Sequence, residues 1–256
     1  MNALRFRARL EELYGLWRSI RVYHLDRAHH RAMDALYRRF VRPGDLVFDI
    51  GAHVGDRISS FRRLGARVVA LEPQPGPARV IRWIHGRDPL VTLLPMAAGA
   101  AAGRLLLKVN ARNPTVSTAS ESFIESARGA PGWEGQVWDR TLEVEVTTLD
   151  RLVARFGVPA FVKIDVEGFE DRVLSGLSTA VPALSFEFTT IARDVARRCL
   201  ERLSALGPYG FDYALGETQR LVLGRWVPAE IVSEIVARLP HEANSGDIYA
   251  RLVEDR

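Results

Sequence analysis

Charged residues occupy alternate positions in one largely apolar stretch of the sequence, at Lys163, Asp165 and Glu167. The apolar character of residues 161–168 is typical of a parallel strand buried inside a sheet. Lys163 and Asp165 are two residues apart, so a strand places both side chains on the same face. Buried charges are costly unless they are paired, so the stretch predicts either an ion-pair cluster or a functional site. We favour a site, because ligands of parallel sheets bind outside the carboxyl ends of the strands.

A second polar pattern combines an aspartate, two glycines and a glutamate. An apolar run ends at Asp49, a turn opens at Gly51 and closes at Gly55, and a helical pattern follows. Glu72 ends another apolar run, 23 residues after Asp49. Strand, glycine turn and helix form the first unit of a nucleotide-binding α/β sheet. The acid after the second strand is placed to accept hydrogen bonds from ribose hydroxyls.

The glycine spacing and Asp49 distinguish between nucleotide ligands. Gly51 and Gly55 do not complete the G-x-G-x-x-G fingerprint of dinucleotide-binding sites. Asp49 would also face the negative charge of a pyrophosphate. S-adenosylmethionine carries no phosphate and bears an ammonium and a sulfonium group. The residues therefore favour S-adenosylmethionine over NAD, although a plain strand-to-helix connection can have the same turn.

Alternating strand and helix patterns surround these motifs. We expect strands at 46–49, 68–71, 90–94, 105–109, 142–146, 161–165, 183–188, 211–213, 221–223 and 247–252. We expect helices at 57–64, 78–85, 149–155, 169–177, 191–206 and 229–239. Residues 110–139 lack a regular pattern, and loops of that length are usually functional or disordered. Their tryptophans, Trp133 and Trp138, are expected to be exposed, where they could stack on sugar rings or hold the loop in place.

Residues 1–42 form a separate, arginine-rich helical pattern. We predict an N-terminal helical extension there and one α/β domain over 43–256. The basic helices either cap the sheet with solvated faces or contact acidic membrane lipid or a polyanionic substrate. Peripheral membrane contact through this basic segment is therefore one prediction, and its simple packing against the sheet is the other.

Composition limits the other function classes. The chain has 256 residues, a formal net charge of +4 and one cysteine, Cys199, which excludes a disulfide within the chain and a cysteine metal cluster. No stretch approaches ~18 uninterrupted apolar residues, and no signal-peptide pattern opens the sequence. We therefore expect a cytoplasmic protein without a transmembrane segment and without a nucleic-acid partner.

The motifs can be compared as a set, over residues 47–55, 71–75, 148–150 and 163–170, with Glu187 closing the next strand. Together they resemble the FkbM family of S-adenosylmethionine-dependent methyltransferases. The resemblance runs from about residue 45 to residue 187, over half of the chain. It implies a Rossmann-like, seven-strand methyltransferase sheet, mostly parallel with one reversed strand, and with helices on both faces.

The resemblance also implies a cofactor, a reaction and a set of site residues. The reaction is methyl transfer from S-adenosylmethionine to a hydroxyl, often on a sugar of a polysaccharide, glycolipid or secondary metabolite. Asp49 and Gly51 would contact the methionyl end of the cofactor, Glu72 the ribose, and Asp165 the region of the transferred methyl. The expected cofactor-binding set also includes His53, Gly55, Pro73, Ala97 and Ala98. At His53 the family pattern usually has asparagine.

A sugar hydroxyl is a poor nucleophile unless a base takes its proton as the new bond forms. Asp165 is the first candidate for this base, and Lys163 would orient or charge-balance it. Glu167 or Glu187 could bind substrate hydroxyls or a metal. Nothing in the sequence demands a metal, because no histidine lies beside these acids, and we predict no metal site.

Two other readings belong to different classes of protein. A binding protein could keep the cofactor pocket and only sense S-adenosylmethionine or hold a partner, but the acids at both strand ends argue against it. A dehydrogenase is disfavoured by the glycine spacing. Calorimetry with S-adenosylmethionine and NAD separates the dehydrogenase from the others, and turnover of labelled methyl groups separates an enzyme from a binder.

Overall fold

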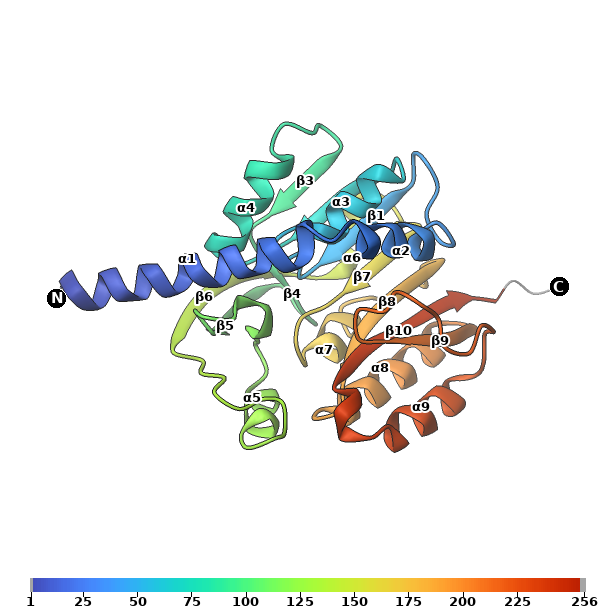
Figure 1. The fold of residues 1–256 in the computed structure, drawn as a ribbon. Helices are drawn as coiled ribbons and strands as arrows, with labels where there is room; N and C mark the ends of the chain where they lie inside the picture. Colours follow the sequence, from blue (N-terminus) through green and yellow to red (C-terminus); the bar gives the residue numbers. More distant parts are fainter. Residues whose placement is uncertain (1, 254–256) are drawn as a thin grey trace.

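A seven-stranded sheet forms the centre of the computed structural model, which describes residues 2–253, with side chains from residue 11 onward except that of residue 12 (Figure 1). Its strands are β1 (Leu46–Ile50), β2 (Arg67–Leu71), β3 (Val91–Leu94), β7 (Phe161–Ile164), β8 (Ala183–Thr189), β9 (Tyr209–Leu215) and β10 (Ser245–Leu252). The strand order is β3-β2-β1-β7-β8-β10-β9. Every pairing among the first five strands of this order is parallel, and β10 is antiparallel to both β8 and β9. The predicted sheet with one reversed strand is confirmed.

Helices cover both faces of this sheet. They are α1 (Asn2–His24), α2 (Arg27–Tyr37), α3 (Asp56–Arg63), α4 (Pro75–His85), α5 (Glu121–Ala127), α6 (Leu149–Phe156), α7 (Glu170–Leu174), α8 (Arg193–Leu206) and α9 (Ala229–Arg238), with short 3-10 turns η1 (Pro114–Val116) and η2 (His241–Ala243). Figure 1 shows α3 and α4 on one side of the sheet and α8 and α9 on the other. Within the described residues, no helix is long and apolar enough to span a bilayer.

The period-two alternation of strand side chains decides which residues reach each helical layer. On β1, Phe48 and Ile50 pack into a core with α6 to α9, whereas Val47 packs into the core with α2 and α3. Asp49 shares the face of Val47. On β7, the same alternation puts Lys163 beside Phe161, which also packs with α2 and α3. The sheet therefore directs its buried charges toward the layer of α2 and α3.

The N-terminal helices join this layer in different ways. On α2, Met33, Leu36 and Tyr37 are buried in the core with α3. On α1, Gly15 lies so close to residues 111–114 that a Cβ there would sit 2.9 Å from the carbonyl oxygen of residue 111. The predicted helices are confirmed, and α1 is held against the irregular segment through Gly15. Membrane contact by this part of the chain stays a prediction.

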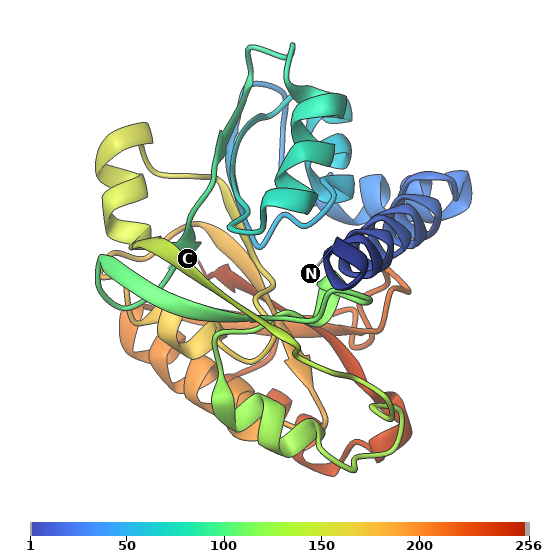
Figure 2. The ribbon, with the colours of Figure 1, turned by 90° about the vertical axis from the view of Figure 1, so that its left-hand side faces the viewer.

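A second, three-stranded sheet extends beside the first, in the order β4 (Ala97–Ala98), β6 (Arg140–Thr147) and β5 (Gly103–Val109) (Figure 2). Several details differ from the sequence expectations, and the helix expected at 169–177 is the shorter α7, Glu170–Leu174. Residues 110–139 contain α5, whose first turn is capped by Ser120 accepting from the Phe123 N–H at 3.1 Å. The strand expected at 221–223 is wrong. The Leu223 N–H donates to Asp212 Oδ1 at 3.0 Å, so a side chain takes the place of a strand partner.

Candidate active site

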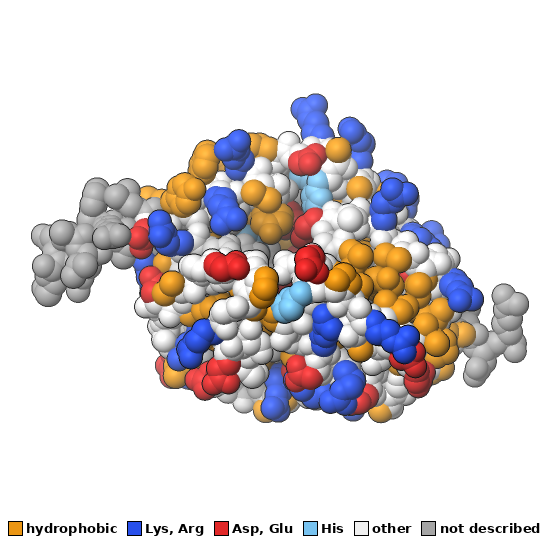
Figure 3. Space-filling model, turned by 60° about the horizontal axis from the view of Figure 1, so that its bottom comes forward, with side chains coloured by type: hydrophobic (Ala, Val, Ile, Leu, Met, Phe, Trp, Pro, Cys, Tyr) orange, Lys and Arg blue, Asp and Glu red, His pale blue; other side chains and the backbone are white. Residues whose placement is uncertain are grey.

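A cavity of about 290 Å³ opens beyond the carboxyl ends of β1, β2 and β7. Ligand pockets usually measure about 300–1,000 Å³, so this cavity is at the lower end of the size of small-molecule sites. Figure 3 shows a face of the molecule that is hollowed, with acidic and apolar side chains around the hollow. The predicted site residues that line the cavity are Asp49, Gly51, His53, Glu72, Pro73, Ala97, Ala98, Lys163, Asp165, Glu167 and Glu187. Gly55 is not among the lining residues.

The glycine turn lets two strand ends approach each other closely. Gly51 has a φ of +83°, and a Cβ there would lie 1.8 Å from the carbonyl oxygen of Asp165. Only glycine therefore fits between the ends of β1 and β7. Gly55 has a φ of +82° and immediately precedes α3, so it shapes the start of the helix. The turn thus brings Asp49 and Asp165 to one edge of the sheet.

His53 also lies in the left-handed region, with a φ of +47°. Histidine is among the residues that enter this region most readily, so it can occupy this position. The His53 ring meets the Tyr23 ring of α1 edge-on, with centroids 5.6 Å apart. Burial lowers the pKa of His53 to about 4, so the ring is neutral at pH 7. Its backbone N–H donates to Glu72 Oε2 at 2.8 Å.

Glu72 is held at the end of β2 by two backbone donors. Its Oε2 accepts from His53, and its Oε1 accepts from the Gln74 N–H at 2.7 Å. Burial raises the pKa of Glu72 to about 8, although both hydrogen bonds act in the opposite direction. A carboxylate has about four lone-pair sites, so two remain for a ligand. Glu72 is therefore fixed and can still accept hydrogen bonds.

Asp49 is a buried acid without a complete set of partners. The residue is 1% exposed, and its Oδ2 has no hydrogen-bond partner among the described residues. Burial raises the pKa of Asp49 to about 7, and the charge of Asp56 adds to the effect. Buried polar atoms are almost always satisfied, so this oxygen is suited to a ligand that brings a positive charge or a donor.

Lys163 connects two carboxylates on different elements. Its Nζ lies 2.7 Å from Asp247 Oδ1 on β10 and 3.2 Å from Asp165 Oδ2 just beyond β7. The residue is 1% exposed, and although burial opposes its charge, the two acids raise its pKa well above the usual value. The side chain of Asp165 is 33% exposed and faces the cavity. Burial acts to raise the pKa of Asp165, but Lys163 and Arg57 outweigh it and lower the value.

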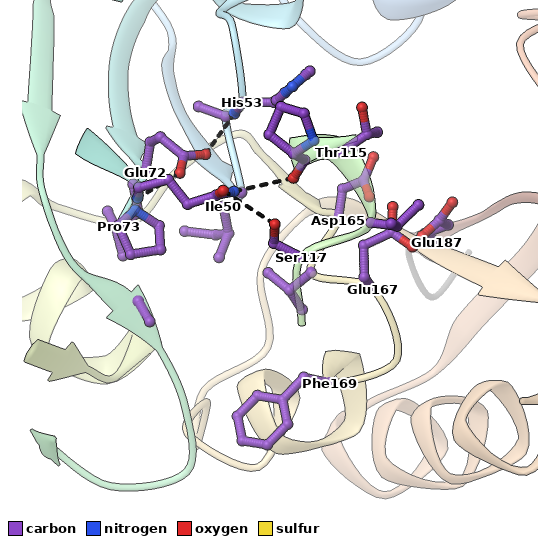
Figure 4. Close-up of a pocket in the computed structure, with 18 of the residues that line it drawn as sticks. Ile50, His53, Glu72, Pro73, Thr115, Ser117, Asp165, Glu167, Phe169 and Glu187 are labelled. Atoms are coloured by element: carbon purple, nitrogen blue, oxygen red, sulfur yellow. Dashed lines mark hydrogen bonds between the residues drawn. The ribbon is translucent and has the colours of Figure 1, made fainter. Parts of the chain in front are cut away.

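Three acids, which we call the acidic cluster, lie together on one side of the cavity: Asp165, Glu167 and Glu187. One carboxylate oxygen from each lies within 4.8 Å of the others. Burial and neighbouring carboxylates raise the pKa values of Glu167 and Glu187 well above the ordinary range. Figure 4 shows the acidic cluster on one side and Glu72 on the other. The cavity thus has a ribose-type acid at one end and clustered carboxylates at the other.

The two tryptophans of residues 110–139 are not exposed, contrary to the sequence expectation. Trp133 is buried, lines the cavity and packs edge-on against Phe123 with centroids 5.2 Å apart. Trp138 is partly buried, and its Nε1–H donates to the Val116 carbonyl oxygen at 2.8 Å. Both rings hold the segment to the core of the protein, but only Trp133 lines the cavity.

Sequence reasoning missed several residues of the site. Tyr23, Arg57 and Gln74 line the cavity. Arg57 is buried and pairs with Asp56 and with Glu217, the latter at 2.8 Å. Gln74 donates from Nε2 to the Pro114 carbonyl oxygen at 3.1 Å and accepts from Ser117 Oγ at 3.0 Å, which ties η1 to the cavity. A polar residue two positions after Glu72 was a usable signal for Gln74, whereas the pattern of α1 carried none for Tyr23.

Comparison with protein families matches residues 49–212 to the methyltransferase FkbM domain. The match covers more than half of the 256 residues. The chain belongs to the FkbM methyltransferase family. This finding confirms the resemblance seen in the motifs, and it makes the cavity the candidate active site of this FkbM methyltransferase.

Relatives of this FkbM methyltransferase include other methyltransferases. The hexuronic acid methyltransferase AglP of Haloferax volcanii is 24% identical over 184 residues, which cover 71% of this chain and 70% of AglP. The O-methyltransferase from Bacillus cereus in complex with SAH has a TM-score of 0.47 and 11% identity, covering 96% of this chain and 90% of that chain. The precorrin-6y C5,15-methyltransferase from Geobacter metallireducens GS-15 has a TM-score of 0.46 and 13% identity, covering 90% and 91%. Both TM-scores are low, so the fold assignment rests on the strand order.

Proposed function

We propose that this protein transfers a methyl group from S-adenosylmethionine to a hydroxyl oxygen of a sugar, such as a hexuronic acid residue. The observation that carries the proposal is the pairing of two kinds of acid in one cavity. Glu72 is buried at one end, the half-buried Asp165 faces the cavity at the other, and Asp49 is buried at the end of β1. The name of AglP supports the acceptor class, and family membership supports methyl transfer.

The residues at the end of β1 and β2 fit the cofactor. The unpartnered Oδ2 of Asp49 suits an ammonium group, because a buried carboxylate gains most from a charged partner. The free lone pairs of Glu72 suit the two ribose hydroxyls. Pro73, Ala97 and Ala98 line the cavity and carry no charge, as a base ring requires. S-adenosylmethionine, when bound there, supplies the electrophilic methyl group.

On the acceptor side, the chain must hold the hydroxyl oxygen in line with the methyl carbon and the sulfur, and it must remove the hydroxyl proton. Placement of the reacting groups supplies much of the rate of such a displacement. Asp165 accepts the hydroxyl proton as the new carbon–oxygen bond forms and the bond between the methyl carbon and the sulfonium sulfur breaks, which leaves S-adenosylhomocysteine. The Lys163 ammonium, 3.2 Å from Asp165 Oδ2, keeps this carboxylate ionised and limits its rotation. One third of the Asp165 side chain is exposed, so an acceptor can reach it.

A non-catalytic binder on the same fold is the alternative. It would require the cofactor end of the cavity, but it would not require an ionised carboxylate at the opposite end. The cavity-facing Asp165 therefore favours an enzyme. Titration with S-adenosylmethionine alone does not separate the two functions, because both predict binding. Turnover is the decisive readout.

The experiment uses S-adenosylmethionine with a labelled methyl group and two sets of acceptors, glycans that contain hexuronic acid and matched glycans of neutral hexose. We expect label to enter the hexuronic acid glycan and to survive mild alkali, because a methyl ether is stable and a methyl ester is hydrolysed. Alkali-labile label would overturn the hydroxyl assignment. Cofactor binding without turnover on any acceptor of either set would favour the binder.

A further inference from the structure

The acidic cluster brings together three carboxyl groups, of which only Asp165 has a cationic partner among the described side chains. Its three carboxylates come from two neighbouring strand ends, with Asp165 and Glu167 beyond β7 and Glu187 on β8. Their nearest oxygens lie within 4.8 Å of one another. Like charges at this distance repel strongly in a buried site, so the arrangement needs either shared protons or a cation.

Glu167 gives an independent sign of a missing partner. The residue is 7% exposed and lines the cavity, yet no donor among the described residues reaches its carboxylate. Its backbone is fixed separately, because its carbonyl oxygen accepts from Thr118 Oγ1 at 2.6 Å. Oε2 of Glu187 is also buried without a partner. Glu187 thus has one buried oxygen without a partner although its carboxyl also contacts Asp165, and the Glu167 carboxylate beside them has no hydrogen bond among the described residues.

The positively charged side chains that line the cavity pair mainly with acids outside the acidic cluster. The cavity-lining acids are Asp49, Asp56, Glu72, Asp165, Glu167, Glu187 and Glu217, and the lining lysine and arginine are Lys163 and Arg57. Lys163 bonds to Asp247 at 2.7 Å and reaches only Asp165 of the acidic cluster. Arg57 pairs with Asp56 and Glu217. Glu167 and Glu187 therefore have no salt bridge among the described residues.

We propose that Asp165, Glu167 and Glu187 bind one divalent cation of the oxygen-preferring kind, such as Mg²⁺, Mn²⁺ or Ca²⁺. Carboxylate oxygens are the preferred ligands of these ions. Two oxygens that each lie about 2.0–2.6 Å from one ion are at most about 4–5 Å apart, which agrees with the separation in the acidic cluster. The expectation of no metal followed from the lack of a nearby histidine, and hard cations do not need one.

The cation has a use in the proposed reaction. Three protein ligands would leave coordination positions free for water or an acceptor, and the ion would lower the pKa of a bound hydroxyl, whose proton Asp165 would accept on the carboxylate oxygen that does not bind the ion. An anionic acceptor such as hexuronic acid would otherwise meet a cavity whose charged side chains are mostly acids. This role rests on the proposed function, whereas cation binding itself follows from the acidic cluster alone and is tested without cofactor or acceptor.

The test titrates Mn²⁺ into the full chain and follows binding by calorimetry and by the electron paramagnetic resonance signal of free Mn²⁺. The variants are Glu167→Gln and Glu187→Gln, which keep shape and remove charge. Glu145→Gln on β6 is the control, because this glutamate is exposed and does not line the cavity. We expect one tight Mn²⁺ per wild-type chain, binding weakened at least about tenfold in each cavity variant, and no change in the control.

Thermal melting gives a second readout that does not depend on any variant. Mn²⁺ and Ca²⁺ should raise the Tm of the wild-type chain, since a ligand of the folded state stabilises it. Absence of saturable binding by the wild type, or equal binding by wild type and both cavity variants, would overturn the proposal in favour of shared protons. If Mn²⁺ binds as expected and no methyl transfer occurs, the cation site stands and the proposed function fails.

Discussion

Lys163 lies closer to Asp247 than to Asp165, with Nζ 2.7 Å from Asp247 Oδ1 and 3.2 Å from Asp165 Oδ2. Asp247 is on β10, which is separated from the β7 strand of Lys163 by β8. Asp247 is as deeply enclosed as a core residue, whereas Asp165 is partly exposed to the cavity. The buried ion pair is therefore Lys163–Asp247, and Asp165 is a second contact of the lysine on the side of the site.

This geometry predicts unequal costs for two matched substitutions. Asp247→Asn should lower the free energy of unfolding by about 3 kcal/mol, because it removes the better partner of a buried ammonium. Asp165→Asn should cost less than half of that, because Lys163 keeps Asp247 and the lost charge is partly solvated. Urea denaturation of both variants measures the difference. Equal losses would show that the lysine depends on both acids alike.

Glu72 should contribute to cofactor affinity. Glu72→Ala should weaken S-adenosylmethionine binding by roughly 1.5–3 kcal/mol, the range for hydrogen bonds to a charged group, which corresponds to about a 10- to 150-fold higher Kd. Isothermal calorimetry checks this value, with the exposed Glu145→Ala as the matched control. An unchanged Kd in a folded Glu72→Ala protein would remove Glu72 from the cofactor site.

The raised pKa of Glu72 predicts a pH dependence of stability in the ligand-free protein. Its pKa is about 8 in the folded chain and 4.5 as a free side chain, so between these values the folded state holds a proton that the unfolded state releases. The free energy of unfolding should fall as pH rises through this window, by up to about 1.4 kcal/mol per pH unit. Glu72→Gln cannot titrate and should lose stability less steeply. Denaturation curves measured from pH 5 to pH 8 give the free energy of unfolding at each pH. The same dependence of this free energy on pH in both proteins would contradict the assignment.

The two tryptophans of residues 110–139 should separate acceptor binding from simple packing. Trp133→Phe shortens a ring that lines the cavity and should raise the acceptor KM while the Kd of S-adenosylmethionine stays unchanged. Trp138→Phe removes the hydrogen bond to Val116 and should cost about 1 kcal/mol of stability without a change in KM. Steady-state kinetics and melting of both variants provide the comparison. A KM that rises only in Trp138→Phe would reverse the two roles.

Local patterns were enough to predict the sheet strands that hold the site. The apolar runs that end at Asp49, Glu72 and Asp165 correspond to β1, β2 and β7. In each case the acid lies at the carboxyl edge of the sheet. The failures depend on distant or weak signals. Leu223 donates to Asp212 and is not part of a strand, and α5 has only seven residues, too few for a clear period.

Other site residues could not be predicted because their positions depend on the tertiary fold. Asp247 contacts Lys163, which is 84 residues away in the sequence. The local sequence indicates this contact only by a charged residue within an apolar strand. Tyr23 reaches His53 only because α1 packs, through Gly15, against residues 111–114. The chemistry of the site was therefore predictable from strand ends, but the partners that hold it in place were not.

The rate of methyl transfer by Asp165→Asn tests the account most directly. The variant keeps the shape of the side chain and removes its basicity, and Lys163 retains Asp247. Labelled S-adenosylmethionine at saturation, with turnover, cofactor Kd and Tm measured on the same preparation, gives the answer. We predict a kcat lower by ~10²–10⁴, with a near-normal Kd and Tm. A kcat within a few fold of wild type, or a loss of rate that is matched by a collapsed Tm, would contradict the assignment of Asp165 as the base.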